Sequence, residues 1–121
     1  MDDEPGICRS LTIGFSRRGF DVRTSRTGDG AVRLLKQEPF DVMVVDLRLP
    51  DMRGDTVYEF AKSIRPELTQ YTLFITGDIT DRAERIIEAC HCPLLRKPFD
   101  LHDIVKAVMQ ILPRQAGDAS A

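Results

Sequence analysis

The chain has 121 residues, enough for one domain of ordinary size, and 17 basic against 19 acidic side chains give it a net charge of −2. That balance argues against sequence-independent nucleic-acid binding, which needs a basic face, and the longest apolar run, Val42–Val45, is far too short for a membrane span. The acidic start Met1–Glu4 is unlike a signal peptide, and three cysteines cannot all pair, so we expect a cytoplasmic protein.

Five segments carry apolar side chains at the spacing of an amphipathic helix. The first is opened by Pro5, which is well tolerated in a first helical turn, and Thr80 and Asp100 are candidate N-caps of the last two. In chain order the apolar stripes are Ile7, Leu11 and Phe15; Ala31, Leu34 and Leu35; Val57, Phe60, Ala61 and Ile64; Ala83, Ile86, Ile87 and Cys90; and Leu101, Ile104, Val105 and Val108.

Short apolar runs without helical period lie between these helices. Residues 41–46 and 71–76 read as buried strands, 20–25 as an edge strand and 93–95 as a short strand. Strands that alternate with helices predict an α/β domain with a parallel sheet covered on both faces. We place this domain at residues 1–112 and expect 113–121, which lack apolar period, to form a flexible tail.

Polar residues close the predicted strands at Asp46, Thr76 and Lys97, and Asp2 and Asp3 precede the first helix. Because ligands of such sheets bind beyond the carboxyl ends of the strands, we expect these side chains to converge there. Clustered carboxylates suit a hard cation such as Mg²⁺, and a carboxylate beside a divalent ion and a lysine suits phosphoryl transfer.

The chain resembles the receiver domain of two-component response regulators from Asp2 to about Leu112. Each matching motif is weak alone, but all occur in order and at the spacing of a five-unit βα repeat. They are Asp2-Asp3-Glu4-Pro5, Gly28-x-x-Ala31-Val32-x-x-Leu35, Asp41 to Asp46 followed by Leu49-Pro50, Gly54, Ile75-Thr76-Gly77 and Lys97-Pro98-Phe99.

The resemblance implies a flavodoxin-like, doubly wound (βα)5 fold with strand order 2-1-3-4-5. It implies that Asp46 accepts a phosphoryl group from a phosphohistidine on a sensor histidine kinase or a histidine phosphotransfer protein, which makes the domain a signalling module rather than an enzyme acting on other molecules. Thr76 and Lys97 would contact phosphoryl oxygens, and a cis Lys97–Pro98 bond would aim the lysine into the pocket. The implied Mg²⁺ ligands are Asp2, Asp3, Asp46 and the main-chain carbonyl of Arg48.

The sequence departs from the family at its start, because only Met1 precedes the acidic pair where a hydrophobic strand is usual. Truncation, a strand borrowed from a partner (including exchange within a homodimer) and a four-stranded variant are all open, and we favour the first two. Unpaired strand edges would otherwise be exposed. A charged amino group beside Asp2 would also compete with Mg²⁺, so we expect weaker metal binding than in a full receiver.

Two further positions differ from the usual pattern or invite a hypothesis. Leu94 stands where the last strand usually carries an aromatic switch residue, so signalling would have to run from Thr76 through the loop 77–80. Arg48 and Asp78 should lie at the pocket rim, and an ion pair between them could slow hydrolysis of a phosphoaspartate; two independent charges are the alternative.

Parts of the sequence are also compatible with three other functions. A pseudo-receiver, an interaction module that is not phosphorylated, is favoured by the short start and Leu94 but opposed by Asp46, Thr76 and Lys97. A haloacid-dehalogenase-type phosphatase needs an acid two residues after the nucleophile, where this chain has Arg48. The run 90–92, Cys-His-Cys, could hold zinc only with ligands from elsewhere, and no glycine-rich nucleotide loop is present.

Overall fold

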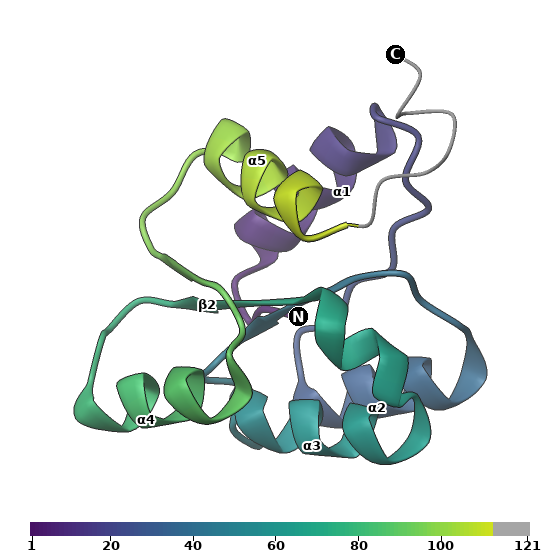
Figure 1. Cartoon of the computed structure of the whole chain (residues 1–121). Helices are drawn as coiled ribbons and strands as arrows, with labels where there is room; N and C mark the ends of the chain where they lie inside the picture. The colour runs from purple at the N-terminus through teal and green to yellow at the C-terminus, as the bar shows by residue number, and fades with distance from the viewer. Residues whose placement is uncertain (113–121) are drawn as a thin grey trace.

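The computed structural model describes residues 1–112, and the predicted tail lies outside this range. Three strands alternate with five α-helices and one 3₁₀ turn (Figure 1). In chain order they are α1 (Pro5–Ser16), α2 (Gly28–Gln37), β1 (Met43–Asp46), α3 (Gly54–Ile64), η1 (Pro66–Tyr71), β2 (Thr72–Thr76), α4 (Asp81–Cys90), β3 (Leu94–Arg96) and α5 (Leu101–Ile111).

The strands form one parallel sheet in the order β1-β2-β3. Val45 pairs with Phe74, and Phe74 pairs with Leu94, so β2 lies in the middle and every one of its residues is buried. This is the arrangement expected for the last three strands of the order 2-1-3-4-5. The prediction for the last strand was displaced by one residue, since β3 extends to Arg96.

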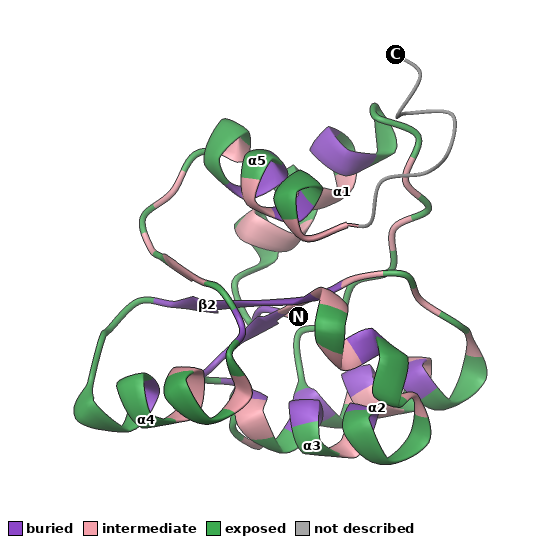
Figure 2. Ribbon diagram, in the orientation of Figure 1, coloured by how far each residue is buried: buried purple, intermediate pink, exposed green. Residues whose placement is uncertain are grey.

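Helices cover both faces of the sheet, with α1 and α5 on one side and α2, α3 and α4 on the other (Figure 1). Alternate residues of β2 enter the two layers: Phe74 joins the cluster under α2 and α3, and Leu73 and Ile75 join the cluster under α1 and α5. Burial is concentrated along the sheet and the facing helix stripes (Figure 2). The α/β prediction is therefore confirmed.

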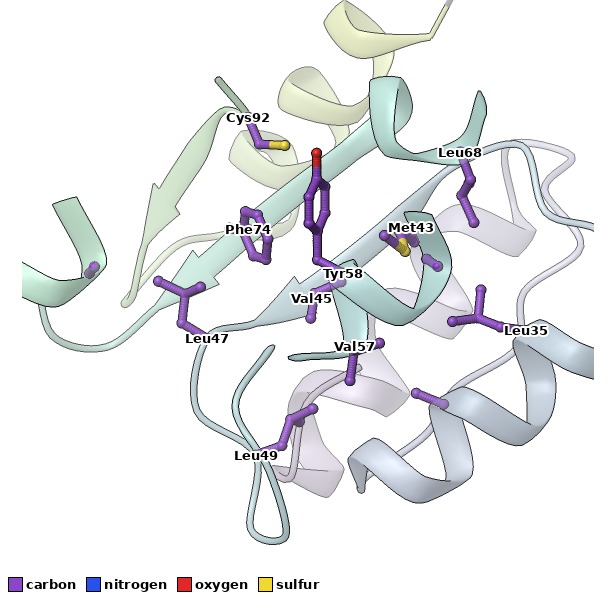
Figure 3. Packing of buried hydrophobic residues seen from close by; sticks show 13 residues of the cluster. Leu35, Met43, Val45, Leu47, Leu49, Val57, Tyr58, Leu68, Phe74 and Cys92 are labelled. Carbon is purple, nitrogen blue, oxygen red and sulfur yellow. The ribbon is translucent and has the colours of Figure 1, made fainter. Parts of the chain in front are cut away.

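The larger core cluster is packed around the ring of Phe74 (Figure 3). Tyr58 of α3 lies against it with ring centroids 5.5 Å apart, and Val45 and Val57 are fully buried beside them. Cys92, in the loop before β3, is a further buried member of this cluster. Aromatic burial of this kind fixes α3 on β1 and β2, and thereby fixes the loop that begins at Asp46.

Helices α4 and α5 begin at the N-cap residues predicted from the sequence. Thr80 accepts a hydrogen bond from Ala83 N, and Asp100 forms a reciprocal capping box with Asp103. Thr27 caps α2 in the same way, by accepting from Gly30 N.

The predicted edge strand at 20–25 is wrong, because the structure has no strand there. A strand at this position needs a neighbour between it and β1, and Met1 and Asp2 alone occupy that place. Met1 N donates to Val44 O at 2.8 Å, Asp46 N donates to Met1 O at 2.9 Å, and Asp2 N donates to Ser25 O at 3.0 Å. Two residues thus make the last rungs of a parallel ladder, which is too little to order the whole segment.

An apolar cleft of about 130 Å³ continues from this ladder between the segment 20–25 and β1. Leu11, Leu35 and Val44 are among the side chains that line it. Because the N–H and C=O of one residue in a parallel strand point to the same edge, the Val44 N–H faces the cleft as the Val44 carbonyl does. The cleft is therefore bounded by a strand edge with backbone groups directed into it.

No helix within residues 1–112 combines the length and the hydrophobicity required to cross a bilayer.

Candidate functional site

Asp46 ends β1 with a buried carboxylate at the carboxyl edge of the sheet. Its Oδ1 accepts from Arg48 N at 2.9 Å, and its Oδ2 accepts from Lys97 Nζ at 2.8 Å. Burial raises the pKa of Asp46, and the hydrogen bonds from Lys97 and the Arg48 amide oppose that shift. The carboxylate is thus held by two donors while one side of it faces the pocket.

Lys97 follows β3 directly and is joined to Pro98 by a cis peptide bond. Its side chain reaches the carboxylate of Asp46. Its ammonium lies 2.8 to 2.9 Å from one oxygen each of Asp46, Asp2 and Glu4. Burial acts to lower the pKa of Lys97, but its contacts with these three carboxylates outweigh that effect and the pKa is raised. Lys97 is therefore a fixed positive charge at neutral pH.

Asp2 supplies a second buried carboxylate, 1% exposed. Its Oδ1 accepts from Glu4 N at 2.9 Å. Its Oδ2 lies 2.9 Å from Lys97 Nζ but has no partner in hydrogen-bonding geometry. The close partner of this oxygen is a cation, so a metal ion here would compete with the Lys97 ammonium.

Asp2, Asp3 and Glu4 bring one carboxylate oxygen each within 4.8 Å of one another. Asp3 and Glu4 are exposed, and Asp2 is buried next to Asp46 through their common contact with Lys97. An all-oxygen donor set that includes one buried oxygen without a hydrogen bond fits a hard divalent cation such as Mg²⁺. Glu4 was not singled out from the sequence, since its role depends on where Lys97 folds to.

Thr76 ends β2 at the same edge, but its hydroxyl is turned to its own loop. Oγ1 donates to Asp78 O at 2.9 Å and accepts from Asp78 N at 3.2 Å. The structure therefore brings Thr76 to the pocket without a contact to Asp46. A bound phosphoryl group would have to compete with the Asp78 backbone for this hydroxyl.

These side chains share one open pocket of about 870 Å³ at the carboxyl ends of the strands. Its lining includes Asp3, Glu4, Asp46, Arg48, Thr76 and Lys97. Carboxylates, a hydroxyl and an ammonium from four separate segments thus converge as the strand-end rule predicts. The arrangement can neutralise an anion next to a buried carboxylate.

The predicted ion pair between Arg48 and Asp78 is wrong, because no ion pair joins them within residues 1–112. The Thr76 hydroxyl binds both backbone groups of Asp78 and fixes that turn. Arg48 pairs through its backbone with Arg53. Both side chains line the pocket as separate charges, which was the alternative interpretation.

Gly54 brings α3 close to the phosphoacceptor candidate. Its N–H donates to Leu47 O at 2.9 Å, and a Cβ at this position would overlap the carbonyl of Asp46. A glycine is therefore required for the backbone of α3 to pass so near the end of β1.

The run 90–92 has the properties of packed thiols. Burial raises the pKa of Cys92 to about 12, and Cys92 N donates to Cys90 Sγ at 3.4 Å. A raised pKa disfavours the thiolate that zinc requires. Within the described residues, the group of potential ligands close enough to share an ion is the acidic one at residues 2–4.

Residues 1–109 match the family model of the response regulator receiver domain. The chain belongs to this family. The receiver domain is 32% identical over 121 residues to the transcriptional regulatory protein KdpE of Mycobacterium tuberculosis, covering 98% of this chain and 52% of that protein. It is 30% identical to the response regulator protein PilR of Pseudomonas aeruginosa, covering 98% of this chain and 27% of that one. The chain thus spans about half the length of KdpE and a quarter of PilR.

Solved structures share the fold of this receiver domain. A CheY-like receiver protein from Methanospirillum hungatei superposes with a TM-score of 0.82 at 22% identity, covering 90% of this chain and 86% of that one. A response regulator from Burkholderia pseudomallei, crystallised with a phosphorylated aspartic acid, a calcium ion and citrate, has a TM-score of 0.77 at 24% identity over 98% of this chain and 66% of its own. The flavodoxin-like fold predicted from the sequence is confirmed.

Proposed function

We propose that Asp46 of this receiver domain accepts a phosphoryl group from a phosphohistidine on a sensor histidine kinase or a histidine phosphotransfer protein. The observation that carries the proposal is the pair of contacts by which Lys97, in the pocket at the strand ends, joins the buried carboxylates of Asp46 and Asp2. The phosphorylated aspartic acid in the Burkholderia pseudomallei response regulator, which has the same fold, supports it.

In this reaction an oxygen of Asp46 attacks phosphorus in line with the bond to the histidine nitrogen. A P–O bond forms and the P–N bond breaks, the electron pair stays on the imidazole nitrogen, and that nitrogen takes a proton from solvent. Burial leaves the oxygens of Asp46 weakly solvated and less stabilised as an anion than those of an exposed carboxylate, which raises the pKa of Asp46. Lys97 compensates the charge that enters with the phosphoryl group.

Asp2, Asp3, Asp46 and the Arg48 carbonyl are the residues that would hold Mg²⁺, which when bound neutralises charge on the transferring group. The buried Oδ2 of Asp2, which has an ion pair with Lys97 but no hydrogen bond, supports such a site. Asp3 is exposed, so its ligation would be adjustable or through water. The Met1 ammonium adds a competing positive charge, although burial lowers its pKa.

Phosphorylation would be read out through the loop after β2. The Thr76 hydroxyl must leave Asp78 to reach a phosphoryl oxygen, and that change releases the turn that leads to the N-cap of α4 at Thr80. Leu94 offers no polar tip for a second switch. We infer that the output is a change in protein contacts along 77–80 and α4, a population shift rather than turnover of a substrate. A direct contact with nucleic acid is not required of this domain, and its net charge of −2 does not favour one.

The proposal is tested by incubating the chain with acetyl phosphate and Mg²⁺ and measuring the intact mass. We expect the mass of one added phosphoryl group, lost on omission of Mg²⁺ and absent in Asp46→Asn. Asp41→Asn, which changes an exposed carboxylate before the same strand, should be phosphorylated like the wild type. No mass increase in a folded wild-type chain would favour the pseudo-receiver instead.

Arg48→Ala should leave the lifetime of the phosphorylated state nearly unchanged. The substitution keeps the main-chain carbonyl, and the Arg48 side chain has no ion pair with Asp78 in the structure. An exposed charge of this kind contributes at most about 1 kcal/mol, so a change beyond about fivefold would show that the side chain acts on the phosphate directly. The lifetime is measured by the decay of the phosphorylated mass after removal of the donor.

A further inference from the structure

One side chain, Asp51, fastens the loop that follows Asp46 to the start of α2. Its Oδ1 accepts from Gly28 N at 2.7 Å, and its Oδ2 accepts from Asp29 N at 2.9 Å. These N–H groups belong to the first turn of α2, where the helix itself offers no acceptor. A single carboxylate thus joins the loop to two consecutive amides that lie 23 and 22 residues earlier in the sequence.

The residues that flank Asp51 in this loop also make close contacts. The side chain of Met52 lies so close to Gly28 that a Cβ on Gly28 would overlap it. Leu49 is buried, and its N–H donates to Met52 O at 3.2 Å. The contacts on both sides of Asp51 therefore hold the loop against the first turn of α2.

The near end of the same loop is at the proposed cation site. Arg48 N donates to Asp46 Oδ1, which keeps the Arg48 backbone beside the phosphoacceptor candidate. Leu47 and Leu49 are buried in the core, but Arg48, Pro50, Asp51 and Arg53 are exposed, so polar contacts such as those of Asp51 contribute to the conformation of this loop. The backbone conformation at Arg48 therefore depends on where the rest of the loop is attached.

The start of α2 is also linked to the other half of the site. Asp2 N donates to Ser25 O at 3.0 Å, and Ser25 Oγ donates to the carbonyl of Thr27, the N-cap of α2. The same helix end therefore holds Asp2 on one side and, through Asp51, the loop of Arg48 on the other. The hydrogen bonds of Asp51 to Gly28 and Asp29 are the contacts that attach the loop of Arg48 to this helix end.

We propose that Asp51 is a positioning residue for the cation site, because its carboxylate fixes the loop that carries the Arg48 carbonyl relative to Asp2 and Asp46. The inference rests on the proposed function, since it takes these three residues as Mg²⁺ ligands. Asp51 itself is exposed at the helix end and does not belong to the proposed ligand set.

The test compares Mg²⁺ binding to the wild-type chain, Asp51→Ala and Asp29→Ala by titration calorimetry. Asp29→Ala is the matched control, because it removes a carboxylate at the same helix end but keeps the backbone N–H that Asp51 binds. Loss of an outer residue that orients ligands commonly weakens metal binding 10- to 100-fold, so we expect at least a ~10-fold higher Kd for Asp51→Ala. Asp29→Ala should stay within about twofold.

Amide hydrogen exchange provides the second readout. We expect Asp51→Ala to accelerate exchange at Leu49 and at Gly28, while the amides of β2 keep their protection. If Asp51→Ala does not fold, Asp51→Asn, which keeps one acceptor oxygen, takes its place with a smaller rise in Kd. An unchanged Kd in a folded variant overturns the inference and leaves the proposed function standing. A wild-type chain that binds no Mg²⁺ overturns both.

Discussion

A four-residue apolar segment, Val-Ile-Leu-Val, fused to the amino end of Met1 is expected to raise the free energy of unfolding by about 3 kcal/mol. The cleft beside β1 is apolar, and the ladder bonds of Met1 to Val44 and Asp46 set the register in which a strand would continue. Burial of each added side chain contributes roughly 1.5–3 kcal/mol, but the entropy lost when that residue becomes ordered offsets most of this gain. The rest of the expected stabilisation comes from new backbone hydrogen bonds, at about 1 kcal/mol each.

A Gly-Ser-Gly-Ser extension of equal length is the matched control, because it removes the terminal charge without filling the cleft. The two variants are compared by urea unfolding and by hydrogen exchange at Val44. The apolar extension should protect the Val44 amide, which faces the cleft, and the polar extension should not. Equal stability of the two variants would show that the cleft does not accept a strand.

Both extensions should also change the pH dependence of stability. Burial lowers the pKa of the Met1 amine below its usual value of 8.0, so between the two values the folded chain binds fewer protons than the unfolded chain. Stability of the unextended chain therefore rises as pH increases toward about 8. An extended chain has an amide in place of the buried ammonium, and this slope should disappear.

The sequence predicted those parts of the molecule that local pattern determines. The helices followed from apolar periodicity, and the caps at Thr80 and Asp100 followed from side chains that bind their own helix. The meeting of Asp46 and Lys97 followed from the geometry of parallel sheets, in which every carboxyl end lies at one edge.

What the sequence missed depends on contacts between distant segments. The segment 20–25 has strand composition but no neighbour along most of its length, and a strand requires a ladder partner. Glu4 reaches Lys97 from 93 residues away, and Asp51 reaches α2 across the loop, so neither role has a local signature. The orientation of the Thr76 hydroxyl is set by the turn at Asp78, which side-chain spacing does not specify.

Lys97→Met is expected to lower the free energy of unfolding by about 2 kcal/mol at neutral pH. The substitution keeps the length of the side chain but leaves the buried carboxylates of Asp2 and Asp46 without the ammonium between them. Removing one partner of a buried ion pair costs about 3–5 kcal/mol, and the open pocket reduces this by admitting water. Lys62→Met, at an exposed position in the last turn of α3, should change stability by less than about 0.5 kcal/mol.

The deficit should shrink as the pH falls. Burial already raises the pKa of Asp46, and loss of the Lys97 hydrogen bond raises it further. A carboxyl with a raised pKa in the folded state holds a proton where the unfolded chain, near 3.8, does not, so acidification stabilises the folded state. Urea unfolding from about pH 7 to about pH 5 should show the variant approaching the wild type. A deficit that is constant over this range would mean that lost packing, and not unpaired charge, explains the effect.

Mg²⁺ should stabilise Lys97→Met more than it stabilises the wild type. In the wild type the ammonium lies 2.8 to 2.9 Å from the same oxygens of Asp46 and Asp2 that a cation would use, so the two positive charges compete. Stabilisation by a ligand grows with the ratio of its concentration to its Kd, and the shift in midpoint therefore reports the change in affinity. Phosphoryl uptake should nevertheless be lost in the variant, because the charge that Lys97 supplies to the incoming group is missing. Tighter Mg²⁺ binding together with lost uptake would assign to Lys97 a role in phosphoryl transfer that the cation does not replace.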